Sequence, residues 1–380
     1  MKIKQFLFKT VFPTLLITGT VLLAVSPIGC KVSEEGIQLL AGDFSVPHIT
    51  SVAVTSDTTV CLCFDKQVHD ATATITAKSS EDSFTATCSF LQEEKQIIYT
   101  LNKKMQPGAM YILDGSITDQ NGNTLTYSIP FAGYNAFVPD IVLSEIRNAY
   151  STTTDSSTQE KKYKCEFIEL YALSDGNLAG LELVSAGDGE EKKYEFPAIT
   201  VKKGEYIVVH LRKMENGCID ETGTDLTCST ATDSCETARD LWIDNTKARL
   251  SQTDIIMLRN ANNNSVIDAV VFAQSAITSW KTDFEPFSAA VKSSGVWLDA
   301  EGNASCAISS AICSDSLTSS AATRTLSRQN VLLLAQEYSP VKKANNASVW
   351  IITANKGSGS AKIPGDTPGR PNSDNAYTEK

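Results

Sequence analysis

The sequence predicts an all-β protein with two Ig-like β-sandwich domains in tandem, the second carrying two long loop insertions. Short runs rich in Val, Ile, Thr and aromatic residues recur from residue 49 onward, each bounded by turn residues. This spacing is typical of β-sandwiches. The 380 residues are enough for two domains with separate cores.

Residues 1–29 have the pattern of an export signal, with a Lys-containing start, an apolar stretch and Gly29 directly before Cys30. This ending resembles the lipobox of bacterial lipoproteins, although Pro27 stands where the motif usually has Leu. The resemblance implies lipid modification of Cys30 and anchoring to a bacterial membrane, on the periplasmic or surface face of the outer membrane. Residues 30–44 would then be a tether. An uncleaved single anchor or cleavage at another position is the alternative.

Charge and motif content exclude several functions. The net charge is -11, and loss of a signal with three Lys and no acid leaves about -14. Nucleic-acid binding needs clustered basic residues, so we expect no nucleic-acid partner. The three His are scattered, and no protease, hydrolase, P-loop or dinucleotide motif occurs. We therefore predict no catalytic residues and a protein that is not an enzyme.

Residues 45–135 contain the first set of predicted strands. Two turns stand out near its end, Met105-Gln-Pro-Gly-Ala-Met-Tyr111 and Ile117-Thr-Asp-Gln-Asn-Gly-Asn123. This part resembles the SbsA-type bacterial Ig-like domain, in which a Pro-Gly turn leads into an aromatic strand. The second stretch departs from the EF-hand pattern, so it predicts a hairpin turn rather than a calcium loop.

Residues 138–373 contain the second set of strands, followed by a polar tail at 374–380. Its landmarks resemble those of the lamin-tail domain, which implies an Ig-like sandwich associated with binding and scaffolding. Leu181 and Lys203 depart from the family pattern, and Gly180 and Gly204 are expected to need a positive φ or a close approach. The landmarks are Ile141-Val-Leu-Ser-Glu-Ile146, Glu166-Phe-Ile-Glu-Leu-Tyr171, Leu178-Ala-Gly-Leu-Glu-Leu183, Lys203-Gly-Glu-Tyr-Ile-Val-Val209, Leu250-Ser-Gln-Thr-Asp-Ile-Ile-Met-Leu258, Val266-Ile-Asp-Ala-Val-Val-Phe272 and Thr367-Pro-Gly-Arg-Pro-Asn372.

Alternation places Phe167, Glu169 and Tyr171 on one strand face and Ile168 and Leu170 on the other. If the strands that carry Glu145 and Glu169 are neighbours, the two carboxylates form a pair of the kind used for acid–base chemistry or for a bound cation. The interpretation we favour is a polar strand face with two solvated acids.

The predicted insertions span about 211–245 and 281–349. The first is acidic, and Asp220, Glu221 and Asp225 are weak candidates for calcium ligands; otherwise no metal or cofactor is expected. Both segments contain cysteines, and disulfides are permitted in an exported protein. The candidates for bridges, whose pairing the sequence leaves open, are Cys218, Cys228, Cys235, Cys306 and Cys313.

Together these features predict an exported, lipid-anchored, non-enzymatic binding or scaffolding protein of the bacterial cell envelope or surface. Its expected partners are the membrane, through the N-terminal lipid, and an unidentified protein or glycan. The alternative is a metal-dependent hydrolase of nuclease or phosphatase type, with an acidic site at Glu145, Glu169 or the acidic segment of the second domain.

Overall fold

The computed structural model describes residues 43–78, 83–91, 93–318, 322–336, 345–357 and 362–379. The predicted export signal and Cys30 lie outside these ranges. The chain divides after Ser45 into two units, and every element below belongs to the second, Val46–Lys380. Within the described ranges, no helix is long and apolar enough to cross a membrane.

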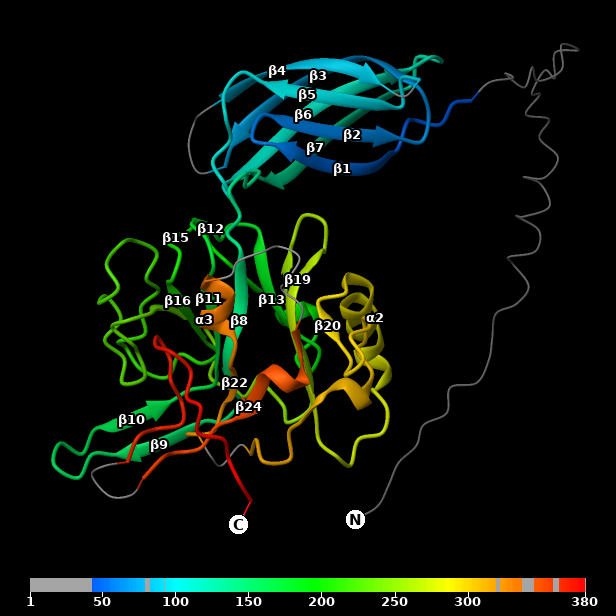
Figure 1. Ribbon diagram of the computed structural model, residues 1–380. Helices are drawn as coiled ribbons and strands as arrows, with labels where there is room; N and C mark the ends of the chain where they lie inside the picture. Colours follow the sequence, from blue (N-terminus) through cyan, green and yellow to red (C-terminus); the bar gives the residue numbers. More distant parts are fainter. Residues whose placement is uncertain are drawn as a thin grey trace, which may run out of the picture. The chain divides into compact units, whose positions relative to one another are not determined.

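The first sandwich contains β1 (Ile49–Ser56), β2 (Thr59–Phe64), β3 (Val68–Ala77), β4 (Ser83–Leu91), β5 (Gln96–Leu101), β6 (Met110–Asp119) and β7 (Thr124–Ala132). They form one antiparallel sheet in the order β1-β2-β5-β4-β3-β6-β7, folded over on itself (Figure 1). Alternate side chains from both halves, such as Leu62, Ile97, Ile75 and Leu113, are fully buried in one core. This is the sandwich that the sequence predicts.

The turn predicted at residues 117–123 is also present. Asp119 accepts hydrogen bonds from the backbone N–H groups of Asn121 and Asn123, both at 2.9 Å, and Gly122 has a φ of +82°. The side chain and the glycine therefore close the tight connection between β6 and β7.

The second sandwich has more elements, and several are very short. Its strands are β8 (Ile141–Arg147), β9 (Ser151–Thr154), β10 (Lys161–Lys164), β11 (Phe167–Ala172), β12 (Gly176–Asn177), β13 (Leu181–Ser185), β14 (Tyr194–Glu195), β15 (Thr200–Val201), β16 (Tyr206–His210), β17 (Arg239–Trp242), β18 (Asp254–Asn260), β19 (Val266–Ala273), β20 (Trp297–Leu298), β21 (Ile312–Cys313), β22 (Leu326–Arg328), β23 (Asn345–Asn346) and β24 (Trp350–Ile352). Its helices are η1 (Glu190–Lys192), η2 (Thr282–Phe284), α2 (Glu285–Ser294), η3 (Ile308–Ser310), α3 (Val331–Gln336) and η5 (Ala347–Val349).

Two sheets enclose the main core of this domain. One has the order β17-β16-β11-β8-β22-β24 and the other β14-β13-β18-β19-β21. Ile168 and Val209 from the first meet Ile256 and Val270 from the second in one buried cluster. The protein is therefore all-β, with two sandwiches in tandem. Gly180 and Gly204 have φ values of +79° and +89°, as their positions at strand boundaries predict.

The two segments predicted to be loops contribute strands to these sheets. Residues 211–245 return as β17, which pairs in parallel with β16. Residues 281–349 supply α2, α3 and β22, and β22 pairs with β8 inside the six-stranded sheet. Residues 211–238 have neither helix nor strand, as the loop prediction expects. The prediction missed β17 and β22 because they have four and three residues, too few to show alternation.

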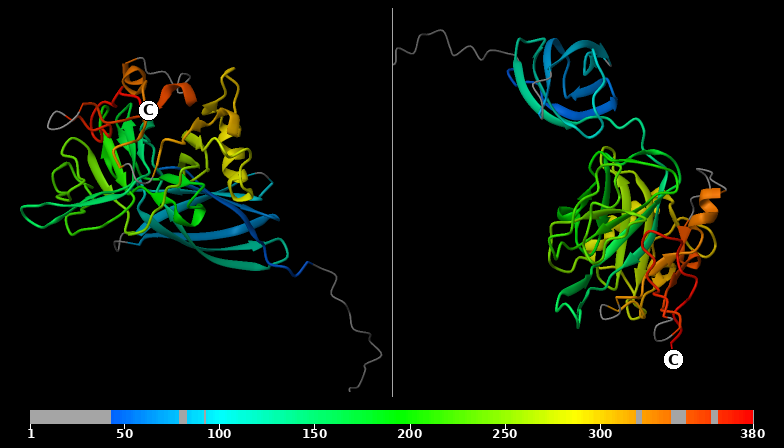
Figure 2. Two further views of the ribbon diagram at one scale, coloured as in Figure 1. Left: turned by 90° about the horizontal axis from the view of Figure 1, so that it is seen from below. Right: turned by 90° about the vertical axis from the view of Figure 1, so that its left-hand side faces the viewer.

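The six-stranded sheet is buried on both faces. Val142, Phe167 and Tyr206 point away from the main core and pack in a second cluster with Ala238 and Val331. The cover consists of the segment before β17, α3 and the C-terminal segment. Consequently every residue of β8, β11 and β16 is buried. By contrast, the β9–β10 hairpin extends away from the sandwich (Figures 1 and 2).

Candidate functional site

Glu145 on β8 and Glu169 on β11 form a buried carboxylate pair. They are direct partners in the antiparallel register of the two strands, and such partners lie about 4.5–5.5 Å apart at Cβ. Both side chains are fully buried. The predicted alternation is therefore confirmed, but the expectation of two solvated acids was wrong, because the outer face of this sheet is covered.

The C-terminal motif Thr367-Pro-Gly-Arg-Pro-Asn372 covers the carboxylate pair. Thr367 donates to Oε2 of Glu145 from its backbone N–H at 3.0 Å and from its hydroxyl at 3.1 Å. The N–H of Gly369 donates to Oε2 of Glu169 at 2.7 Å. The Asn372 amide donates to the carbonyls of Ser144 and Arg328 at 2.9 and 2.8 Å. The motif thus joins β8 and β11 through the two glutamates, and β8 and β22 through Asn372.

The two glutamates differ in how well their charge is compensated. Burial raises the pKa of Glu145 to about 7, although hydrogen bonds from Thr325, Thr367 and Ser327 favour its ionised form. Burial, and then the charge of Glu145, raises the pKa of Glu169 well above its usual value. Oε1 of Glu169 has no hydrogen-bond partner among the described residues. Glu169 is therefore the carboxyl that retains a proton when only one is ionised.

An ion cluster lies beside the pair on the same face. Arg147 donates to Asp366 at 2.9 Å, to Asp233, and to the carbonyl of Cys165 at 2.7 Å. His210 bonds Asp240 at 2.8 Å and stacks on Trp242 with ring centroids 3.8 Å apart. These charged groups are buried, and each has a partner of opposite charge. They connect β8 and β16 to the segment before β17 and to the C-terminal segment.

Glu145, Glu169 and the motif that covers them form an acidic centre with the features of a structural lock, which attaches the C-terminal segment to the sheet. General acid–base chemistry needs a carboxyl within hydrogen-bond reach of its substrate. Here both carboxyls are fully buried beneath the C-terminal motif and are bonded to it. Their geometry supports attachment of the last segment rather than contact with a substrate.

The three candidate calcium ligands do not form a site. Asp220 accepts from the N–H of Trp242 at 2.6 Å, Glu221 from the N–H of Asp240 at 2.8 Å, and Asp225 from the N–H of Thr227 at 2.9 Å. Among the described residues, no three His, Cys, Asp or Glu side chains are grouped to hold a metal ion. Instead, Asp220 and Glu221 hold the acidic segment against β17.

The predicted disulfides are absent from the structure, because all nine described cysteines are free thiols. Cys218 is buried in a small cluster with Cys165 and Trp242, while Cys228 is exposed. Cys235 lies beside the carbonyl of Pro368 at 3.2 Å. Cys306 is buried and Cys313 on β21 is exposed. Nearness in sequence predicted pairs that the fold places in different environments.

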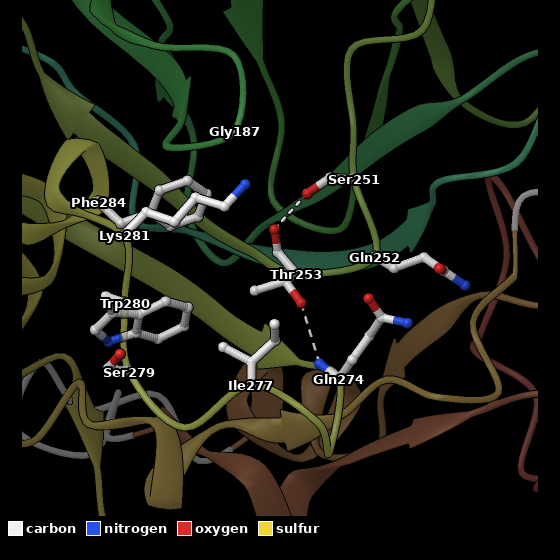
Figure 3. A pocket seen from close by; sticks show the side chains of 10 residues that line it. All are labelled: Gly187, Ser251, Gln252, Thr253, Gln274, Ile277, Ser279, Trp280, Lys281 and Phe284. Atoms are coloured by element: carbon white, nitrogen blue, oxygen red, sulfur yellow. Dashed lines mark hydrogen bonds between the residues drawn. The ribbon is translucent and has the colours of Figure 1, made fainter.

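An open recess of about 310 Å³ lies at one end of the five-stranded sheet (Figure 3). Trp280 and Phe284 form one side, with nearly parallel rings whose centroids are 5.8 Å apart. Polar residues line the other side, in the segment before β18 and directly after β19. The polar residues are Ser251, Gln252, Thr253 and Gln274.

The walls of this recess are held in place by interactions behind them. The indole N–H of Trp280 donates to the carbonyl of Cys306 at 2.6 Å. Thr253 accepts from the N–H of Gln274 at 3.1 Å. Asp254, fully buried, accepts from the N–H of Gly187 at 2.9 Å, and burial raises its pKa to about 6. A pre-formed recess loses little entropy when it binds a ligand.

Sequence reasoning did not identify this recess. Its residues come from four segments, around Gly187, Ser251, Gln274 and Phe284, and only the fold brings them together. A usable signal was present in Trp280-Lys281, an aromatic and a cation in an otherwise polar stretch.

Fold and site define an all-β protein of two sandwiches, the second of which combines a locked acidic centre with an open aromatic recess. Within this class the chain can be assigned to a family. Residues 139–352 match the family model TP_1001_2nd, described as "protein second domain". The match covers more than half of the chain, so the protein belongs to this family.

A curated relative from Treponema pallidum (strain Nichols), named "Uncharacterized protein", is 27% identical over 205 residues. The alignment covers 52% of this chain and 49% of the relative, so this chain spans about half the length of the relative. Two solved structures show weaker likeness. The N-terminal part of the S-layer protein SbsC is 15% identical, with 34% of this chain and 41% of that chain covered and a TM-score of 0.24. A DUF4876 family protein from Bacteroides thetaiotaomicron is 11% identical, with coverage of 73% and 84% and a TM-score of 0.24.

Proposed function

We propose that this protein is a non-enzymatic binding or scaffolding protein of the bacterial cell envelope, and that the recess beside Trp280 is its ligand site. The observation that carries the proposal is the recess itself. It has an aromatic side, an opposite polar side and a volume of about 310 Å³, within the range of about 300–1,000 Å³ that is usual for small-molecule sites.

The proposal extends to the domain types and to the address of the protein. The first sandwich would be an SbsA-type Ig-like domain and the second a lamin-tail-type domain, on the motifs quoted above. Export and a lipid on Cys30 would hold both domains at a membrane, because the chains of a lipidated Cys together bind a bilayer stably. The protein would then present its recess to ligands at the membrane surface.

The hydrolase alternative has less support from the geometry. Glu145 and Glu169 are buried beneath the C-terminal motif, and the carboxylates of Asp220, Glu221 and Asp225 accept hydrogen bonds from separate backbone groups. An assay of the full mature chain with nuclease and phosphatase substrates, with and without divalent metals, tests it. Metal-dependent turnover that Glu169→Gln abolishes would overturn the non-enzymatic proposal.

The ligand site is tested by ligand-observed NMR on the full mature chain with a collection of water-soluble metabolites and sugars. We expect binding signals that Trp280→Ala and Gln274→Ala remove. Gln120→Ala, which truncates an exposed amide of the first sandwich, is the matched control and should bind as the wild type does. Signals that persist in both recess variants would place the ligand elsewhere and refute the proposed site.

The anchor is tested separately by metabolic labelling of the source cells with a clickable palmitate analogue. Label on the wild-type protein and none on Cys30→Ser is the expected result. An unlabelled wild-type protein would refute lipid anchoring and would leave the recess proposal unaffected.

A further inference from the structure

We propose that the recess beside Trp280 recognises a saccharide ring that carries a carboxylate, such as a uronic acid. This inference rests on the proposed function, since it assigns a ligand class to the same site. It combines three observations: an aromatic side, an opposite side of amides and hydroxyls, and a cation at the rim without an ion-pair partner.

The aromatic side suits the apolar face of a sugar ring. Trp280 is half-buried, and its hydrogen bond to Cys306 fixes the plane of the indole. Phe284, largely buried, packs nearly parallel to it. Aromatic rings offer a large, flat and rigid contact area at little cost in conformational entropy. Sugar C–H groups on one face of the ring make weak contacts with such a π-face.

The opposite side suits sugar hydroxyls. Within the described residues, the side-chain amide of Gln274 makes no hydrogen bond, and the amide of Gln252 uses only its N–H, which donates to Leu317 at 2.9 Å. Each of these groups has donor or acceptor capacity left. Planar amides next to a hydroxyl such as that of Thr253 match vicinal hydroxyls, which donate and accept at once.

Charge distinguishes an acidic sugar from a neutral one. No Asp or Glu is among the residues that line the recess, although the protein has a net charge of -11. Lys281 lies at the rim beside Phe284 (Figure 3) and has no ion pair within the described part of the chain. Many other cations of this protein are paired, including those at Arg147, Arg259 and Lys193. A carboxylate on the ligand would complete this site by pairing with Lys281.

Asp254 favours the same ligand by keeping its own charge out of the recess. It lies behind Gly187, and a Cβ on Gly187 would come within 2.8 Å of Asp254 Oδ2. Oδ2 accepts from the hydroxyl of Ser185 at 2.7 Å and Oδ1 from the N–H of Gly187. Both carboxylate oxygens therefore accept hydrogen bonds from residues that form the wall of the recess. An anionic ligand would contact the backbone of Gly187 rather than this carboxylate.

The test compares sugars that differ only in the carboxylate. Glucuronic and galacturonic acid are titrated into the full mature chain beside glucose and galactose, with intrinsic tryptophan fluorescence and saturation-transfer NMR as readouts. We expect the uronic acids to bind about tenfold or more tightly than their neutral counterparts. Lys281→Gln should remove this preference, so that the uronic acids bind no more tightly than glucose and galactose. Lys292→Gln, an exposed lysine on α2, is the matched control.

Other outcomes separate the two proposals. Equal binding of acidic and neutral sugars, unaffected by Lys281→Gln, would overturn the acidic class and keep the recess as a sugar site. If no sugar binds, but another small molecule binds the wild type and not Trp280→Ala, the saccharide inference would be overturned and the proposed ligand site would be kept. Absence of any ligand sensitive to Trp280→Ala or Gln274→Ala would overturn both.

Discussion

Replacing Glu169 with Gln should flatten the dependence of stability on pH. Glu169 is fully buried opposite Glu145, and its Oε2 accepts a hydrogen bond from Gly369 at 2.7 Å. Glutamine has nearly the shape of the protonated acid and keeps an acceptor for Gly369. The Glu169→Gln substitution therefore removes a titration while leaving the contacts of the protonated form in place.

The sign follows from proton linkage. A carboxyl whose pKa is higher in the folded than in the unfolded protein contributes its full stability below the unfolded pKa of about 4.5 and loses it as pH rises through the folded pKa. Both glutamates have raised pKa values, that of Glu145 to about 7. As pH rises from 5 toward 7, each carboxyl that stays protonated in the folded protein but ionises in the unfolded chain lowers the free energy of unfolding, by at most about 1.4 kcal/mol per pH unit. Glu169→Gln removes one of these contributions, so its stability should rise relative to that of the wild type over this range.

Equilibrium urea unfolding at pH 5, 6 and 7, followed by tryptophan fluorescence, measures this difference. Asp254 and His210 also have raised pKa values, so they act in the same direction, but they are present in both proteins and cancel in the comparison. Glu236→Gln, which changes an exposed acid, is the control, and its free energy of unfolding should depend on pH as that of the wild type does. Two results would refute the reasoning. One is a wild-type free energy of unfolding that rises from pH 5 to 7, and the other is a Glu169→Gln free energy of unfolding that falls relative to that of the wild type over this range.

Three further predictions concern the same domain. Arg147→Met should cost about 3–5 kcal/mol in urea unfolding, because it leaves Asp233 and Asp366 buried without their guanidinium; a cost no greater than that of the exposed Lys161→Met would contradict this. Gly369→Ala should lower the melting temperature more than Gly122→Ala. Both positions have a positive φ, but only at Gly369 would a Cβ lie 2.4 Å from the sulfur of Cys235. Equal losses in melting temperature would show that the Thr-Pro-Gly motif is not closely packed. Burial raises the pKa of the Cys165 thiol to about 12 and that of Cys306 to about 11, so neither should react with Ellman's reagent at pH 8 in the native protein, and rapid reaction of all nine thiols would contradict the fold. The thiols expected to react are Cys88, Cys228 and Cys313.

Local patterns in the sequence determined the strands that are long enough to alternate. Ile168, Leu170, Ile207 and Val209 point into the main core because a strand turns successive side chains to opposite faces. The same logic places Val60, Leu62 and Phe64 in the first core. The Thr-Pro-Gly motif was also visible in the sequence, although its partners, Glu145 and Glu169, lie about 200 residues away.

Tertiary structure decided everything that depends on what covers a strand. Alternation assigns Glu169 to a face but does not say whether that face meets water, and here α3 and the C-terminal segment cover it. Strands as short as β17 and β22 have no period of their own and form only because β16 and β8 offer free edges. The recess has the same origin: Trp280 and Gln274 acquire a common role only when four segments meet. Sequence pattern therefore set the faces of the strands, and long-range packing set which faces became core, lock and ligand site.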